Sequence, residues 1–549
     1  MKEATFIPAD KNAKVAFDYR SVIKNRIREV PDVPMFSFTD NETGEKREVL
    51  PEAFLSAIDS LGRWFSAHGY KRSHIAILGE NSYEWILTMF AIVMSDNVLV
   101  TLDKGLELPS LDFITKKSRS SVLFYSKGFE DKAKALAESY GLSLYRLEDI
   151  GSFAKEGEAL PDTGVIETDA DAPAILMYTS GTTGEPKGVM LSQRNTVGNI
   201  HYASCNSDFS GDSVYLLPLN HIYGLSSALL ITIICNSTVT VNSNMRYMMN
   251  DIQSARPEIL FIVPLFVQTL YGAFRRFLKA KGLDKQIDAM IEENNRRGNV
   301  SMEEKRKMFA EVLAFFGGRL SRIVSGGAPL DMISYRGFYD LGITVLNGYG
   351  ITECSPVLAV NPEEGNKPES VGKVIPELEV RIEGRDENGF GEICVKGPTV
   401  MLGYFENEEE NAKALIDGWF HTGDKGWIDD DDHLYVCGRI KNLIILANGE
   451  NVSPEELEDK IYQNIKEVAE VVVFEKAGRI TAQVFINEEY VAENGIGDPQ
   501  KAVNDGIYKL NLELAVYKRI GAVEFRDTPF EKTTSKKIKR NFQVSGISG

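Results

Sequence analysis

The sequence has few cysteines, and their spacing excludes several kinds of protein. Its five cysteines are scattered along the chain, and no two form a CxxC pair. Neither a disulfide framework nor a zinc site follows from such a pattern. Long apolar runs are also missing, since stretches such as 85–94 and 229–235 are shorter than the roughly 20 residues that span a membrane. With no apolar signal core at the N-terminus, we expect a cytoplasmic protein without a transmembrane segment.

The chain also lacks an excess of basic residues. Its formal charge is −18, which argues against nucleic acid as a partner because phosphate backbones require a basic face. The basic run at 532–540 is either a solvated tail or a phosphate contact. A length of 549 residues exceeds what one hydrophobic core accommodates, so we expect at least two domains.

Helical and strand-like patterns alternate over most of the chain. An amphipathic pattern at 53–69 precedes the short apolar run HIAIL, and the same alternation continues downstream. This rhythm predicts an α/β body of parallel strands with helices on both faces. The charge-rich stretch 274–316 interrupts it and predicts a solvated helical excursion. Further strands are expected at 97–103, 120–126, 213–219, 258–264 and 322–330.

A boundary is expected near 438–441, after an acidic turn and the strand-like LYVCGR. The remaining ~110 residues alternate strands and helices as a compact α+β unit of ordinary domain size. We therefore predict an N-terminal domain at 1–440 and a C-terminal domain at 441–549.

A glycine-rich loop, TSGTTGEPKG at 179–188, follows the apolar run AILMY. Exposed amides, hydroxyls and one lysine can replace water around a polyanion, so this loop predicts a phosphate cradle. The spacing differs from a Walker A loop because Gly188 follows Lys187. A surface turn without a ligand is the alternative. The predicted phosphate contacts are Thr179, Ser180, Gly181, Thr182, Thr183, Gly184 and Lys187.

Further motifs follow this loop in one order, and together they carry a family resemblance. They lie at 217–225 (LPLNHIYGL), 325–330 (SGGAPL), 347–353 (NGYGITE), 391–398 (GEICVKGP), 418–424 (GWFHTGD), 438–444 (GRIKNLI), 448–458 and 533–540. The chain resembles the adenylate-forming superfamily of acyl-CoA synthetases, peptide-synthetase adenylation domains and luciferases. Within it, the chain is most similar to bacterial long-chain fatty acid CoA ligases.

The resemblance implies a fold and a two-step reaction that uses ATP, Mg²⁺ and CoA. A large multi-part N-terminal AMP-binding domain with α/β layers is expected, followed by a small mobile α+β domain. A carboxylic acid and ATP form an acyl-adenylate and pyrophosphate, and the CoA thiol then forms the thioester. A medium- or long-chain fatty acid is the expected substrate.

The resemblance also assigns roles to residues around the nucleotide. It places adenine against Tyr349, phosphate at Thr352 and Mg²⁺ at Glu353, choices that suit a flat apolar ring and a hard cation. Asp424 and Arg439 are expected at the ribose, although a structural Asp–Arg ion pair is an alternative that does not exclude this role. The other predicted nucleotide contacts are Gly327, Ala328, Asn347, Gly348 and Gly350.

Lys537 matches the lysine that the family presents to the reacting carboxylate and α-phosphate. A cation there stabilises a transition state in which two anions meet. Lys187, Glu353 and Lys537 are thus the predicted catalytic residues. Lys536 precedes Lys537 where many relatives have glycine, so Lys536 and Lys539 remain alternatives.

The remaining assignments concern the acyl group, the hinge and CoA. His221, Gly326 and Gly327 are expected at the acyl pocket, with no proton transfer assigned to His221. Lys441 corresponds to the hinge, beside an Asn442 that replaces the commoner acidic residue. Gly449 is expected near the CoA thiol.

Several alternatives remain open at this stage. The acceptor could be a carrier protein, although no carrier domain follows Gly549, and the acid could be aromatic. A non-catalytic nucleotide-binding protein and a P-loop ATPase are rivals from other classes. Peripheral membrane contact would suit a fatty substrate, but no basic amphipathic segment marks it. Nothing in these patterns indicates an oligomeric state.

Overall fold

The computed structural model describes residues 17–39, 44–162, 164–179, 185–242, 244–387, 389–446, 451–532, 538 and 540. The chain divides into two compact units. We call Met1–Leu330, Ser334–Val380 and Val395–Phe420 the larger unit, and Asp331–Ile333, Arg381–Cys394 and His421–Gly549 the smaller unit. The division at 440/441 that the sequence predicts for a mobile C-terminal domain stays a prediction.

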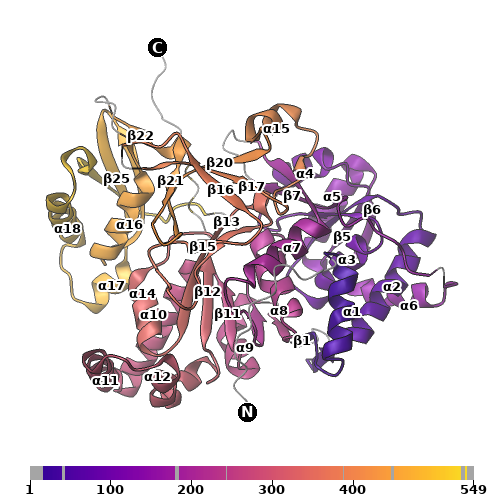
Figure 1. Ribbon diagram of the computed structural model, residues 1–549, viewed down its shortest axis with the longest axis horizontal. Helices are drawn as coiled ribbons and strands as arrows, with labels where there is room; N and C mark the ends of the chain where they lie inside the picture. Colours follow the sequence, from indigo (N-terminus) through magenta and orange to yellow (C-terminus); the bar gives the residue numbers. More distant parts are fainter. Residues whose placement is uncertain are drawn as a thin grey trace. The chain divides into compact units, whose positions relative to one another are not determined.

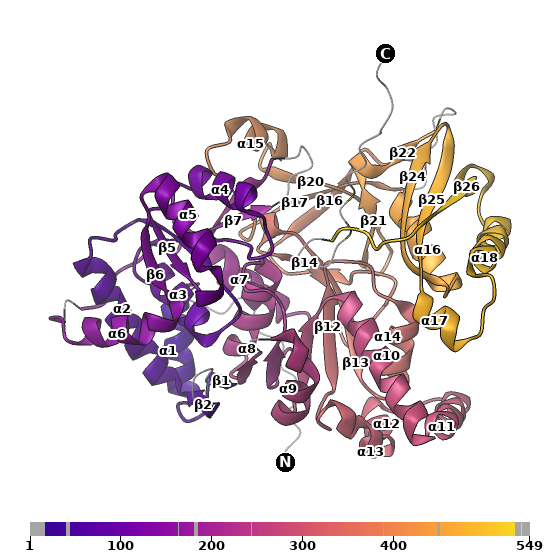
Figure 2. The same ribbon diagram turned by 180° about the vertical axis from the view of Figure 1, so that it is seen from behind.

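A seven-stranded sheet with the order β18-β8-β7-β4-β3-β5-β6 forms one layer of the larger unit. Its five strands from β7 to β6 pair in parallel. Alternate side chains of β3, such as Ala76 and Leu78, pack on Leu111 of α4 and Leu136 of α5. Figures 1 and 2 show α2 and α3 on the opposite side of this sheet from α4 and α5. The predicted α/β layering is confirmed here. The elements are α2 (Pro51–Ala67), β3 (His74–Leu78), α3 (Tyr83–Val93), β4 (Val98–Thr101), α4 (Leu108–Lys117), β5 (Val122–Tyr125), α5 (Glu130–Tyr140), β6 (Ser143–Arg146), β7 (Pro173–Thr179), β8 (Lys187–Ser192) and β18 (Gly403–Tyr404).

The glycine-rich loop departs from the parallel rhythm that the sequence predicts. Strands β7 and β8 pair antiparallel, with Thr179 opposite Lys187 and Tyr178 opposite Gly188. The loop therefore joins two antiparallel strands of the same sheet. Hydrophobic runs on both sides of a glycine-rich turn allow either topology, which is why alternation alone did not reveal the reversal.

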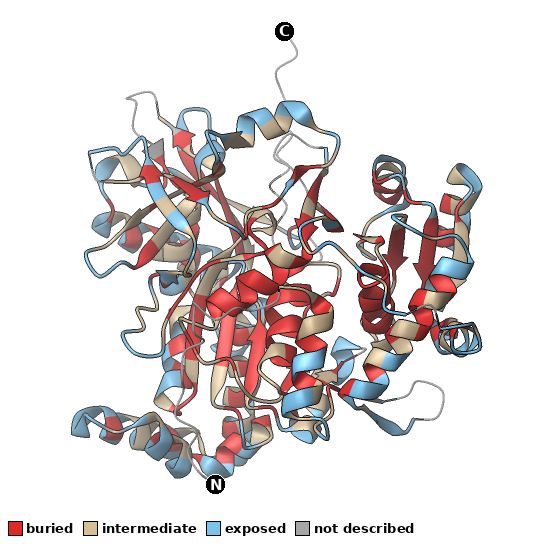
Figure 3. Ribbon diagram, turned by 45° about the vertical axis from the view of Figure 1, so that its right-hand side comes forward, coloured by how far each residue is buried: buried red, intermediate tan, exposed pale blue. Residues whose placement is uncertain are grey.

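A nine-stranded sheet with the order β15-β14-β13-β12-β11-β9-β10-β1-β2 forms the second layer of the larger unit. Strands β9, β11, β12 and β13 pair in parallel, and β14 returns antiparallel to β13. The central strands are largely buried, as Figure 3 shows in red. Their bounds are β1 (Phe36–Thr39), β2 (Lys46–Val49), β9 (Ser213–Tyr215), β10 (Val239–Val241), β11 (Ile259–Ile262), β12 (Arg322–Gly326), β13 (Thr344–Gly350), β14 (Val357–Val360) and β15 (Lys373–Val374).

The charge-rich stretch 274–316 is helical, as predicted. It contains the end of α10 (Pro264–Lys281), then α11 (Asp284–Arg297), α12 (Met302–Met308) and α13 (Ala310–Leu313). Phe274 packs on Phe315 and Phe316, so aromatic contacts join the two ends of this charged helical stretch. Within the described part of the chain, no helix combines the length and the apolar character needed to cross a bilayer.

The smaller unit contains the C-terminal elements that the sequence predicts. Strands β24 and β25 form an antiparallel hairpin through a turn with Gly478 at φ +76°, and β26 adds in parallel to β25. Helices α16 and α18 pack on this sheet through Leu457, Ile461, Val503 and Ile507. The bounds are β20 (Trp419–Ile428), β21 (Leu434–Arg439), β22 (Ile444–Ile445), α16 (Pro454–Asn464), β24 (Val468–Lys476), β25 (Arg479–Ile486), α17 (Glu488–Glu493), α18 (Pro499–Glu513) and β26 (Ala522–Arg526).

Candidate active site

Lys187 opens strand β8 directly after the glycine-rich loop. Its ammonium donates to Glu410 on α15 (Glu408–Ala414) and lies 5.2 Å from the ring centre of Tyr404. The bond from Lys187, helped by Lys413, holds the pKa of Glu410 below its usual range. Lys187 is largely buried and sits at the edge of the cradle that the sequence predicts, with its charge balanced by Glu410.

Tyr404 connects Lys187 to Glu353. The Tyr404 hydroxyl donates to Glu353 Oε1 at 2.9 Å, while the Tyr404 ring faces the Lys187 ammonium. The backbone oxygen of Glu353 also accepts from the Met401 N–H at 2.8 Å, which fixes the short helix Thr352–Cys354 against the 400–404 segment. The structure thus brings together Lys187 and Glu353, two predicted catalytic residues that are far apart in sequence.

The adenine and acyl motifs lie at the carboxyl ends of the parallel strands β12 and β13. Gly326 pairs with Gly348, and a Cβ on Gly326 would lie 3.1 Å from the Gly348 carbonyl oxygen. A Cβ on Gly350 would lie 2.3 Å from the Pro356 carbonyl oxygen, so this position requires glycine. Ligands of open α/β sheets bind at such strand ends. Gly327 and Ala328 are exposed there, and Tyr349 and Thr352 are half-buried.

Asn347 has a structural partner inside this region. Its side-chain amide donates to the Ser370 carbonyl at 2.9 Å, and its own carbonyl accepts from the Asn361 N–H. The buried Asn347 therefore anchors the 361–370 loop to β13. This loop contact was not apparent from the sequence, because it joins segments through backbone atoms that any residue supplies.

His221 lies near Asp103, with 3.8 Å between Nε2 and the nearer carboxylate oxygen. Two residues later, the Tyr223 hydroxyl donates to the Val324 carbonyl at 3.0 Å. This bond places the His221 segment beside strand β12, which ends at Gly326. The predicted acyl residues His221, Gly326 and Gly327 thus belong to one neighbourhood of the larger unit, and their roles stay predictions.

Asp424 and Arg439 face each other across β20 and β21 in the smaller unit. They are register partners, and 2.7 Å separates Asp424 Oδ1 from Arg439 Nε. The Asp424 carboxylate is buried, whereas the Arg439 side chain is 41% exposed. The structural ion pair that the sequence left as an alternative is present. It leaves the guanidinium accessible to a ligand, so it does not exclude the ribose role.

The predicted hinge is tied to the chain terminus by a network of side chains. Lys441 lies in the short helix Ile440–Asn442 and is exposed. The Asn442 amide donates to Glu455 Oε1 at 2.8 Å. Arg540 in turn pairs with Glu455 at 3.4 Å and with the buried Glu458. An asparagine at 442 can donate to Glu455, which an acidic residue could not do.

The segment that carries Lys537 is held at both of its described ends. Lys532 pairs with Glu470 on β24 at 2.7 Å and forms an antiparallel bridge with Ile538. Arg540 pairs with Glu458 on α16. Lys536, Lys537 and Lys539 lie outside the described residues, as do Ser180, Gly181, Thr182, Thr183, Gly184 and Gly449.

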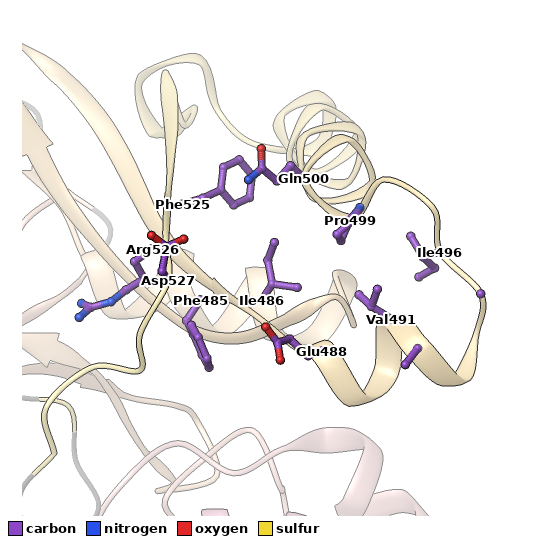
Figure 4. A pocket seen from close by; sticks show the side chains of 12 residues that line it. Phe485, Ile486, Glu488, Val491, Ile496, Pro499, Gln500, Phe525, Arg526 and Asp527 are labelled. Carbon is purple, nitrogen blue, oxygen red and sulfur yellow. The ribbon is translucent and has the colours of Figure 1, made fainter.

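A cavity of about 400 Å³ lies elsewhere in the smaller unit, between the ends of β25 and β26 and the helices α17 and α18 (Figure 4). Phe485, Val491, Ile496 and Phe525 contribute apolar surface, and Glu488 contributes a carboxylate. None of the residues predicted for the active site lines this cavity, so it plays no part in the site described above.

Layered sheets with a lysine at the start of β8, a nearby carboxylate and close-packed glycines at their strand ends are typical of α/β enzymes that bind nucleotides. The chain belongs to the AMP-binding enzyme family, whose pattern it matches over residues 27–405. Residues 441–545 match the AMP-binding enzyme C-terminal domain. The resemblance inferred from the sequence motifs is confirmed.

Named relatives extend this assignment. The chain is 26% identical to long chain acyl-CoA synthetase 5 of Arabidopsis thaliana, over 86% of this chain and 80% of that protein. It is 29% identical to the long-chain-fatty-acid–CoA ligase FadD15 of Mycobacterium bovis, over 76% of this chain and 73% of that protein. The fold matches the Bacillus subtilis o-succinylbenzoate CoA synthetase solved with its acyl-adenylate, with a TM-score of 0.73, 24% identity and coverage of 96% and 98%.

Proposed function

We propose that the chain is an AMP-forming acid–thiol ligase that converts a fatty acid to its CoA thioester through an acyl-adenylate. The carboxylate oxygen attacks the α-phosphorus of ATP, and pyrophosphate leaves. The thiol of CoA then attacks the acyl carbon, and AMP leaves. The first step replaces a poor leaving group by a good one, which is the chemical reason for consuming ATP.

The observation that carries this proposal is the meeting of Lys187 and Glu353 at Tyr404. Adenylation requires a cation that neutralises the departing phosphates. It also requires oxygen ligands for the Mg²⁺ that accompanies ATP, and these groups must lie close together. Lys187 would exchange Glu410 for the β- and γ-phosphates, because both partners offer anionic oxygens to the same ammonium.

The donor set at Glu353 fits Mg²⁺. The Glu353 carboxylate is half-buried and already accepts one hydrogen bond, leaving oxygen lone pairs of the kind this hard cation prefers. When bound, Mg²⁺ would neutralise phosphate charge as pyrophosphate departs. Two neighbouring residues hold Glu353 in position. The Tyr404 hydroxyl orients its carboxylate, and the Met401 N–H binds its backbone carbonyl.

Residues of the smaller unit complete the proposed cycle. We assign the exposed Arg439 guanidinium and the Asp424 carboxylate to the ribose, and Lys537 to the carboxylate and α-phosphate. Rotation at Lys441 would then withdraw Lys537 and present the Gly449 region to CoA. ATP, Mg²⁺ and CoA are the small molecules of this scheme, and free cysteines at all five positions support a reducing, cytoplasmic location.

The names of the relatives support a fatty acid as the substrate, since two of them are long-chain enzymes. The similar fold of the o-succinylbenzoate CoA synthetase supports an aromatic acid as the second candidate substrate. A pyrophosphate-release assay with fatty acids of graded length and with aryl acids, each with and without CoA, separates the two. Thioester formation with a carrier protein in place of CoA would identify the remaining alternative acceptor.

The two half-reactions can be tested separately. Lys537→Ala should lose ATP-dependent adenylation by about 10²–10³-fold, the loss seen when one preorganised electrostatic donor is removed. It should still convert supplied acyl-AMP and CoA to the thioester. Lys536→Ala and Lys539→Ala are matched controls, and an equal loss of both half-reactions in Lys537→Ala would refute its assignment.

The hinge assignment predicts the reverse pattern. Lys441→Pro should leave adenylation and stop thioester formation, because proline fixes the φ angle that rotation must change. Normal thioester formation by this variant would remove the argument for rotation.

A further inference from the structure

A cysteine, a histidine and two glutamates converge on three neighbouring strands of the smaller unit. Glu383 ends β16 (Glu379–Glu383), Glu392 and Cys394 lie two residues apart on β17 (Gly391–Lys396), and His421 lies on β20. These strands are adjacent in the order β16-β17-β20. Residues two apart on a strand share a face. The sheet therefore brings together side chains that are widely separated in the sequence.

The distances among these side chains suit a tetrahedral metal ion. Cys394 Sγ lies 3.4 Å from Glu383 Oε2 and 3.5 Å from His421 Nδ1. One ligand atom from each of the three residues lies within 4.8 Å of the others. Zinc bonds of 2.0–2.3 Å give tetrahedral edges of about 3.3–3.8 Å between ligand atoms. Glu392 Oε2, at 2.9 Å from Nδ1, supplies a fourth group nearby.

A second observation supports a ligand at this cluster. His421 Nε2 is buried and has no hydrogen-bond partner among the described residues, although buried polar atoms are usually paired. A divalent cation would give this nitrogen a partner, because rotation of the imidazole would turn Nε2 toward the ion.

We propose that Cys394, His421, Glu383 and Glu392 form a zinc-binding site, separate from the Mg²⁺ that serves ATP. Sulfur, nitrogen and carboxylate ligands together select Zn²⁺ over Mg²⁺, which takes oxygen ligands. Binding releases the thiol proton. It also displaces Arg381, whose guanidinium donates to Glu383 Oε2 at 2.8 Å.

The site is connected to the nucleotide residue Asp424. Glu392 Oε1 accepts from the Gly423 N–H at 3.0 Å, and the Thr422 hydroxyl donates to the Ile393 carbonyl. The Asp424 N–H in turn donates to Thr422 Oγ1. Zinc binding at His421 would therefore shift the segment 422–424, which positions Asp424. This consequence rests on the proposed function, and it predicts that bound Zn²⁺ changes the KM for ATP.

Titration calorimetry with Zn²⁺ on the nucleotide-free full chain tests the binding site without reference to activity. Co²⁺ gives an independent readout, because a thiolate ligand produces a charge-transfer absorption band. We expect one ion per chain, with affinity lowered by about 100-fold or more in Cys394→Ser and in Glu383→Gln, in line with the effect of losing groups around a metal. Glu383 is half-exposed, so its variant should fold even if Cys394→Ser does not.

Two further variants separate a metal site from an ordinary polar cluster. Arg381→Ala should bind Zn²⁺ more tightly, because it removes the competitor for Glu383. Cys437→Ser, a half-buried cysteine of the neighbouring strand β21, should bind like the parent chain. Absence of the Co²⁺–thiolate band, or equal Zn²⁺ affinity in the parent chain and Cys394→Ser, would overturn the proposal. Zinc binding with an unchanged KM for ATP would keep the site and remove only its link to Asp424.

Discussion

The Asp424 carboxylate lies 2.7 Å from the Arg439 guanidinium, and only the arginine side of this pair reaches solvent. A ligand can therefore contact the arginine without breaking the pair. The arrangement lets the ion pair join β20 to β21 and still leaves the guanidinium open to the ribose contact that we propose.

Replacing Arg439 with alanine should raise the KM for ATP by about 10–100-fold, the value of one or two hydrogen bonds to a charged group. Steady-state pyrophosphate release at varied ATP measures this. Arg439→Lys should recover part of the loss, because it restores the charge without the planar fork. Lowered stability of Arg439→Ala with unchanged KM would leave the pair a purely structural role.

Removing the Tyr404 hydroxyl tests the connection between Lys187 and Glu353. Tyr404→Phe keeps the ring over Lys187 and deletes the bond to Glu353, so adenylation should fall by about tenfold, as for one hydrogen bond to a charged acceptor. The Mg²⁺ concentration for half-maximal rate should rise with it. Glu410→Gln is the matched comparison: it weakens the competitor for Lys187, so the KM for ATP should fall or stay constant. A lower rate in Tyr404→Phe without a shifted Mg²⁺ dependence would contradict the assignment of Glu353.

The smaller unit should lose stability as the pH rises. Burial raises the pKa of Glu458 from 4.5 to about 8, although Arg540 opposes the shift. Because the folded pKa exceeds the unfolded one, the stabilisation is complete below about pH 4.5 and is lost as the pH rises toward 8. Unfolding measured between pH 5 and 9 should show a loss of roughly 2–4 kcal/mol from this group.

Glu458→Gln should flatten that pH profile, because glutamine stays neutral throughout. The exposed Glu493 provides a control, and Glu493→Gln should retain the slope of the parent chain. The neighbouring Asp459 also has a raised pKa, about 7, mainly through burial, so a residual slope is expected in Glu458→Gln. An unchanged slope would show that Glu458 is ionised in the folded chain.

Asn442→Asp should disturb the hinge, because it places a second carboxylate against Glu455. Like charges at this separation repel by roughly 1–4 kcal/mol, depending on solvent exposure. We expect thioester formation to slow more than adenylation, as measured by single-turnover assays of the two half-reactions. Asn442→Ala lacks the added charge and should show a smaller effect. Equal effects of both substitutions would mean that only the lost hydrogen bond matters.

Local patterns predicted most of the strands and helices, because apolar periodicity and turn residues act over a few positions. The antiparallel pairing of β7 and β8 was not predicted, because a glycine-rich turn permits either a parallel or an antiparallel second strand. The motifs indicated Lys187, Glu353, Asp424 and Arg439 at the site. They did not indicate the partners of these residues: Tyr404 and Glu410 sit in ordinary contexts, and only folding brings them to Lys187.

The same reasoning applies to the cysteines. No CxxC spacing marks Cys394, and the sequence offered no zinc pattern around it. Its neighbours Glu383 and His421 come from adjacent strands, where pairing and not sequence separation decides which side chains meet.

The ion pair of Lys532 with Glu470 and the hydrogen bond from Arg540 to Glu458 join the described ends of the lysine-bearing segment to β24 and α16. In the proposed cycle, Lys537 would therefore move together with β24 and α16, and the rotation at Lys441 would determine when it reaches the α-phosphate. An engineered disulfide between the C-terminal segment and α16 should therefore leave the turnover rate unchanged. A cross-link that prevents rotation at Lys441 should stop turnover. In the proposed cycle, rotation at Lys441 would control both half-reactions, and it would bring Lys537 to the reacting groups.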